Sequence, residues 1–93
     1  MKAKVVAAWV GELTSTVFPK LVVIEWVDST MRSGWTSDEY DAETQICVSI
    51  GWITAESKVA LSVSPHISIE SEPQRNGTMT IPKSCIKRIA NLI

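Results

Sequence analysis

The chain has 93 residues, a 45% hydrophobic fraction and a net charge of −1. This length corresponds to one domain, since domains typically hold about 100 to 150 residues, and the composition excludes wholesale disorder. The lack of an excess of basic residues argues against a broad phosphate-backbone binder, and no apolar run approaches the ~20 residues of a membrane span.

Cysteine usage and the N-terminus indicate the compartment. Cys47 and Cys85 lie far apart between apolar neighbours, without a CxxC pair or a His/Cys cluster. We therefore expect reduced, inert thiols, no zinc site and no cofactor. The apolar stretch Val5–Val10 is too short for a secretory signal, so we expect a cytoplasmic protein.

Residues 1–19 are expected to form an N-terminal arm or an extra strand, and residues 20–93 a small β-barrel domain. Lys4–Val10 fits either a strand or a short helical turn, because short apolar runs do not separate the two. Gly11 and the Ser/Thr cluster at residues 14–16 weaken a long helix, so a strand or arm is favoured.

The central predicted strand is Lys20–Val27, rich in β-branched residues. Side chains alternate across a strand, so Val22, Ile24 and Trp26 share one face, which we assign to the core. Glu25 marks the opposite face as the exposed one, although its other residues are apolar.

A long polar segment, residues 28–45, follows this strand. Loops beyond about 12 to 15 residues are usually functional or disordered. Asp28 and Ser29 begin a turn with side-chain oxygens that can bind backbone amides, and Gly34 frees the backbone before Trp35. One helical turn is plausible over residues 38–43.

Three further strands are predicted, at Ile46–Thr54, Val59–Val63 and Thr78–Ile81. Gly51 inside the first of them suggests a bulge or a close backbone approach. The apolar alternating positions of two of these strands are assigned to the core. In the first strand they are Ile46, Val48, Ile50 and Trp52, and in the next strand they are Val59, Leu61 and Val63.

The C-terminal part begins where Pro82 ends the last of these strands. Ser84 can start one helical turn, and Ala90–Ile93 is either a final strand or a frayed tail. The order of strands, long loop, hairpin and short turn predicts an all-β, strongly bent five-stranded barrel of SH3-like or Sm-like type.

Two segments carry a resemblance. Residues 24–29 read I-E-W-V-D-S, and residues 81–86 read I-P-K-S-C-I. The chain resembles, over about residues 20–89, small bacteriophage and prophage accessory proteins that pair an I-E-W-x-D-S strand end with a terminal I-P-K-x-C-I segment. This resemblance implies expression in a bacterial host and, from context, binding of a host factor, including a component of host defence.

Catalysis is not expected. His66, the single histidine, has no partner in its local sequence that would make it the base of a nucleophile. Glu25 and Asp28 are three residues apart on a strand end, so they point to opposite faces rather than across a cleft. The chain is therefore expected not to be an enzyme.

The binding candidates lie in the long loop. An exposed tryptophan can anchor an interface or stack on a base, and Trp35 is the tryptophan with the most polar surroundings. Packing of Trp35 on the core is the alternative. The expected partner- or ligand-binding residues are Trp35, Asp28, Ser29, Gly34 and Tyr40.

A second candidate surface is basic. Lys83, Lys87 and Arg88 could hold a phosphate, so the alternative to a host-protein binder is an oligomeric nucleic-acid or nucleotide binder. A virion structural component is the third hypothesis. Homo-oligomers are expected through strand edges and the apolar arm, since a small open barrel leaves edges exposed.

Overall fold

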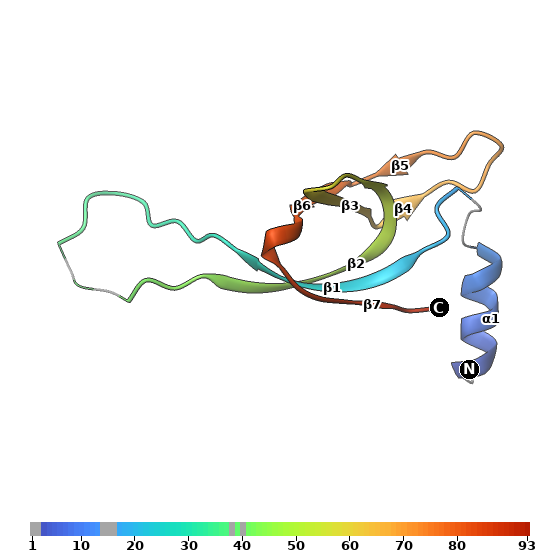
Figure 1. The fold of residues 1–93 in the computed structure, drawn as a ribbon, viewed down its shortest axis with the longest axis horizontal. Helices are drawn as coiled ribbons and strands as arrows, with labels where there is room; N and C mark the ends of the chain where they lie inside the picture. Colours follow the sequence, from blue (N-terminus) through green and yellow to red (C-terminus); the bar gives the residue numbers. More distant parts are fainter. Residues whose placement is uncertain (1–2, 14–16, 38, 40) are drawn as a thin grey trace.

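The computed structural model describes residues 3–13, 17–37, 39 and 41–93. A short N-terminal helix is followed by a β-rich body and a long hairpin loop (Figure 1). The elements, in chain order, are α1 Ala3–Leu13, β1 Leu21–Asp28, β2 Gln45–Glu56, β3 Ala60–Ser64, β4 His66–Ile67, β5 Arg75–Asn76, β6 Met79–Pro82, the 3-10 turn η1 Lys83–Cys85 and β7 Ile86–Asn91.

Five strands form one antiparallel sheet in the order β6-β3-β2-β1-β7, and β4 and β5 pair separately. The predicted strands over residues 20–27, 46–54, 59–63 and 78–81 are confirmed to within a few residues, as is the short turn near residue 84. β6 and β7 are the edges of the sheet, so the structure gives a five-stranded sheet rather than a closed barrel.

The sheet bends within β2, which pairs with β1 along its first half and with β3 along its second. Gly51 lies at the bend. A Cβ atom there would approach the backbone oxygen of Ser64 to 2.7 Å and Cγ2 of Val63 to 2.8 Å. The pairing with β3 also shifts between Ile53 and Ala55. Glycine and a bulge together allow the strand to curl over the core, as bent sheets require.

The core lies inside this curl. Val22 and Ile24 from β1 are almost completely buried, as predicted, and Trp26 packs against them at the rim. Five residues form the buried cluster: Val22, Ile24, Leu61, Val63 and Ile81. Phe18 is also buried just before β1. The burial of these aliphatic side chains is the main source of stability for so small a sheet.

Hydroxyl groups satisfy one another where the core becomes polar. Ser64 is fully buried, and its Oγ lies 2.7 Å from Oγ1 of Thr54 and 2.7 Å from Oγ1 of Thr78. The three hydroxyls link β2, β3 and the segment before β6. Buried polar groups that are paired in this way avoid the cost of desolvation without a partner.

The N-terminal segment differs from the favoured prediction. Residues 3–13 form an α-helix, so the expected extra strand over Lys4–Val10 is wrong, and the helical alternative is the one that the structure adopts. The helix stands across the end of the sheet, near the C-terminus of the chain (Figure 1). Val10 lines an apolar hollow of about 340 Å³ together with Leu21 and Trp52.

The predicted facing of β2 is also wrong. Ile46, Val48 and Ile50 are exposed by 56%, 64% and 59%, and Trp52, which shares their side of the strand, is only half-buried. The register explains this outcome, because Val48 pairs with Glu25 and so lies on the outward face of β1. The inward positions of β2 are the small residues Cys47, Ser49 and Gly51.

Two smaller expectations also change. Val59 lies in the exposed turn before β3 rather than inward, whereas Leu61 and Val63 are buried as predicted. The helical turn expected over residues 38–43 falls partly outside the described residues, and its described members, Glu39 and residues 41–43, are not helical.

Candidate functional site

The loop between β1 and β2, residues 29–44, is the most prominent feature of the molecule. It continues the β1–β2 hairpin away from the body and forms the far end of the structure (Figure 1). The molecule is 55 Å long but only 31 by 23 Å across. All described residues from 29 to 44 are exposed. Such a loop contributes little to the core, and loops of this length are usually either functional or disordered.

The root of the loop is held by its own polar side chains. Asp28 is the last residue of β1, and its Oδ1 accepts a hydrogen bond from the Ser29 backbone amide at 2.8 Å. Thr30 Oγ1 donates to the Glu43 carbonyl oxygen at 2.9 Å and so joins the two limbs of the loop. Asp28 therefore binds a backbone amide at the start of the loop, as predicted. The hydrogen bond of Thr30 was not predicted, because nothing in the sequence distinguishes this threonine.

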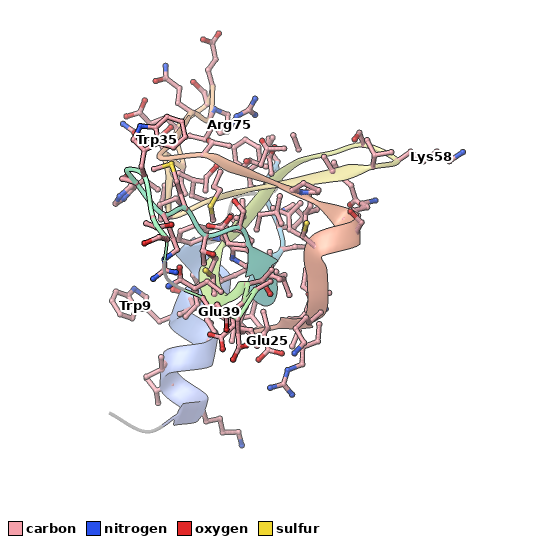
Figure 2. All side chains as sticks on the ribbon, turned by 90° about the vertical axis from the view of Figure 1, so that its left-hand side faces the viewer. Trp9, Glu25, Trp35, Glu39, Lys58 and Arg75 are labelled. Carbon is pink, nitrogen blue, oxygen red and sulfur yellow. The ribbon has the colours of Figure 1, made fainter. Side chains whose placement is uncertain are left out.

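Trp35 lies on the outer part of the loop and is fully exposed. Gly34 precedes it with a φ of +84°, a left-handed conformation that favours glycine, and no atom lies within 4 Å of a Cβ built there. Figure 2, which looks at the molecule from the loop end, shows the Trp35 side chain away from the central strands. The alternative in which Trp35 packs on the core is therefore wrong.

The two limbs of the loop enclose a wide, shallow space of about 770 Å³. Its lining is polar and charged and includes Arg32, Asp41 and Glu43. Small-molecule pockets are mostly apolar with a few polar groups. This space therefore resembles the inside of an open loop more than a ligand pocket. Tyr40, the remaining predicted contact residue, lies outside the described residues.

The predicted basic cluster is divided by the fold. Lys83 Nζ lies 2.6 Å from Glu56 Oε2, at the junction of η1 and the end of β2. Arg88 Nε lies 3.3 Å from Glu25 Oε1 on a different part of the sheet. Two of the three basic side chains are thus paired with carboxylates. Lys87 is exposed on β7.

One of these ion pairs lowers the pKa of a carboxyl group. The hydrogen bond and charge of Lys83 hold the pKa of the Glu56 carboxyl below its ordinary value of 4.5. Both side chains are substantially exposed, so the pair is a surface contact at the rim of the sheet. It ties η1 to the β2–β3 hairpin, together with the hydrogen bond from the Lys83 amide to the Val59 carbonyl oxygen at 2.8 Å.

The residues considered for catalysis lie on different elements. His66 is exposed in β4, where it pairs with Asn76, whereas Cys47 and Cys85 are half-buried free thiols of β2 and η1. Within the described ranges, no group of three or more His, Cys, Asp or Glu residues could hold a metal ion. In the same part of the chain, no helix has both the length and the apolarity to cross a membrane.

A second surface was not predicted. The outward side of β1, β2 and β7 carries a row of exposed aliphatic residues, among them Ile46, Val48 and Ile50. The apolar character of the second face of β1 was the signal in the sequence. It could not be combined with β2 without knowing which residues pair across the two strands.

Comparisons with protein-family models, with curated proteins and with solved structures found no match.

Proposed function

We propose that this protein is a non-enzymatic binding protein that engages a partner protein through the loop at residues 29–44, with Trp35 as the anchor. The observation that carries the proposal is the full exposure of Trp35 on the outer part of a loop whose root is held by hydrogen bonds. Exposed tryptophans are costly in water and enriched among residues that dominate interface energies.

The proposed scaffold is an SH3-like barrel. Three features support it: the strand order β6-β3-β2-β1-β7, the long loop between β1 and β2, and the 3-10 turn between β6 and β7. This is the layout of a small barrel whose first hairpin carries a variable loop. The strongly bent β2 and Gly51 supply the curvature that such a scaffold needs.

The proposed partner is a host protein in the cytoplasm of a bacterium, such as a defence component, in line with the resemblance to phage accessory proteins. The I-E-W-V-D-S segment of that resemblance ends at Asp28 and Ser29, which form the root of the loop. The motif therefore coincides with the part of β1 that positions the proposed contact surface.

The test is affinity purification from phage-infected host cells, comparing wild type, Trp35→Ala and Trp9→Ala, with mass spectrometry of the co-eluting proteins. Trp9 is a matched control, because it is also an exposed tryptophan but lies on α1. We expect Trp35→Ala to lose the partner while retaining the wild-type melting curve. Retention of the partner by Trp35→Ala would refute the role of the loop, and a collapsed melting curve would show that Trp35 supports the fold.

A virion structural component is the second candidate. It is favoured by exposed apolar side chains on three separate elements, namely α1, the loop and the outward face of the sheet. A subunit of a larger assembly needs several contact surfaces of this kind. Detection of the protein in purified particles by mass spectrometry would support this candidate, and its presence only in the host lysate would count against it.

The nucleic-acid alternative has less support, because Lys83 and Arg88 are paired with Glu56 and Glu25. A gel-shift assay at low salt with RNA, DNA and cyclic nucleotides tests it. Binding that weakens as salt is raised would favour it, since contacts to phosphate release counterions.

A further inference from the structure

The outward face of β1, β2 and β7 is a defined surface, referred to below as the outer face. Its centre is set by the strand register: Val23 lies between Ile50 and Ala90, and Glu25 lies between Val48 and Arg88. Directly paired residues in antiparallel strands point to the same side of the sheet, so these rows share one face. The outer face comprises Leu21, Val23, Glu25, Val27, Ile46, Val48, Ile50, Trp52, Arg88 and Ala90.

No element of the chain described by the structure covers this face. β3, β4 and β6 all lie on the opposite side of β1 and β2 (Figure 1). α1 stands across one end, where Val10 lines an apolar hollow together with Leu21 and Trp52. Three β-branched residues of β2 therefore remain more than half exposed. Contiguous apolar surface of this kind marks an interaction site in a small protein.

The pair of charges at the centre of the outer face indicates which partner fits this face. Glu25 and Arg88 are neighbours across β1 and β7, with Nε and Oε1 3.3 Å apart. They border a hollow of about 310 Å³ that is otherwise lined by aliphatic groups, including Val23 and Val48. The face thus presents one acid and one base, side by side, in an apolar surround.

Such a face is complementary to itself. A two-fold axis that runs along the strands between two facing sheets and passes close to Glu25 places the same patch on both sides of the contact and brings Arg88 of each copy within reach of Glu25 of the other. Arg88 is long and 81% exposed along its side chain, so it has room to bridge both glutamates. We propose that the outer face is the contact surface of a two-fold symmetric homodimer.

The sheet supplies only part of the area that a stable dimer needs. Three strands about 4.8 Å apart and eight residues long at about 3.3 Å each give a footprint of roughly 380 Å². A standard interface buries about 800 Å² of accessible surface per partner. The exposed residues Val5, Val6 and Trp9 of α1 are further apolar surface that is available to a partner.

The helix itself needs such a contact. α1 has only 11 residues, and isolated helices shorter than about 12 to 15 residues are marginal in water. In its own copy, Val10 of this helix lines an apolar hollow with Leu21 and Trp52. Packing against a second copy would stabilise the helix and cover the outer face in one arrangement.

The experiment is analytical ultracentrifugation of the full chain over a range of micromolar concentrations, with wild type, Glu25→Lys, Arg88→Glu and an equimolar mixture of the two variants. Each variant alone carries two like charges at the centre of the face, so we expect its dimerisation to weaken by roughly 30-fold or more. In the mixture, a doubly positive face meets a doubly negative one, and we expect the dimer to return as a heterodimer.

Lys58→Glu is the matched control. Lys58 lies in the exposed turn between β2 and β3, far from Glu25 in Figure 2, so this charge reversal should leave dimerisation unchanged. Circular dichroism of each variant at a concentration where it is monomeric checks that it folds, and Val48→Asp provides a second variant in the same face. Trp35→Ala should dimerise like wild type, which separates this proposal from that of the loop.

Three results would overturn the proposal. A wild-type mass that stays monomeric at all concentrations would show that the face is not a self-contact. A mixture of folded variants that fails to restore the dimer would show that Glu25 and Arg88 do not pair between copies. A larger closed ring or an open polymer would exclude the two-fold arrangement.

Discussion

Both faces of the β1–β2 hairpin carry apolar side chains, but one face is buried and the other is exposed. On the inner face, Val22 and Ile24 are almost completely buried, whereas on the outer face Val48 and Ile50 are open to solvent. The difference does not come from the size of the side chains. It comes from β3 and β6, which fold over one side only (Figure 1). Hydrophobic residues along a strand therefore indicate that a face is suited to burial. Which face is buried within one copy of the chain depends on where the other strands pack.

The most direct way to sharpen this comparison is to truncate isoleucine on each face. Ile24→Ala removes a fully buried side chain, and we expect a loss of about 2–5 kcal/mol in the free energy of unfolding. Ile50→Ala removes an exposed one, and at concentrations where the protein is monomeric we expect a change within about 0.5 kcal/mol. Urea denaturation followed by tryptophan fluorescence measures both. Similar losses for the two variants would break the comparison.

The second prediction concerns the bend that closes the inner face. Gly51→Ala places a Cβ 2.7 Å from the Ser64 carbonyl oxygen, so β2 and β3 must separate. We expect a loss of about 1–3 kcal/mol in the free energy of unfolding, as for other overpacked sites. Gly11→Ala is the control, because no atom lies within 4 Å of that position and alanine favours the helix. If both variants melt alike, the close approach at Gly51 is not a constraint.

A smaller effect is expected where the inner face becomes polar. Ser64→Ala removes the hydroxyl that lies between Thr54 and Thr78. We expect a loss of about 1–2 kcal/mol in the free energy of unfolding, since buried groups lose their partners. The exposed Ser62–Thr80 pair, also 2.7 Å apart, is the matched control, and Ser62→Ala should change the denaturation midpoint little. An equal midpoint for the two variants would contradict the importance of burial.

The smallest expected effect lies at the rim, where Lys83 lowers the pKa of Glu56. Because the pKa is lower in the folded state, the pair stabilises the protein above the unfolded value and loses this contribution as the pH falls through the folded value. Glu56→Gln should therefore reduce the urea midpoint slightly at about pH 7 and have no effect at about pH 2. Glu70→Gln, in an exposed loop, is the control. A difference that grows as the pH falls would contradict the assigned ion pair.

The comparison of faces also explains how far the sequence could lead. The core face of β1 could be predicted, because Glu25 marks the opposite face of the same strand. The structure confirms the core positions of Val22 and Ile24 and the packing of Trp26 against them. β2 offers no such marker. Its bulkier side is predicted to face the core, but the register with β1 turns that side outward, and at Gly51 the close approach of β3 leaves no space for a Cβ atom on the inner side. A one-residue change of register reverses the facing of a whole strand, and the sequence does not specify the register of this long hairpin.

The loop could be predicted from the sequence more fully than the other candidate surfaces. Its length, its polar start at Asp28 and the Gly34–Trp35 pair are all local features, but they leave open whether Trp35 is exposed or packs on the core, and the structure shows that it is exposed. The basic cluster was less predictable, since Lys83 and Arg88 meet different carboxylates only after β2 and β1 are placed beside them.

The sequence by itself determined the strands near residues 20–27, 46–54, 59–63 and 78–81, the long loop after the first of them and the irregularity at Gly51. Turn residues, β-branched alternation and an isolated glycine act within a few residues of themselves. Only the tertiary structure decided that residues 3–13 form a helix, that Ile46, Val48 and Ile50 face outward, and that Glu25 meets Arg88. These outcomes depend on which strands pair and in which register, and such contacts join residues far apart in the chain.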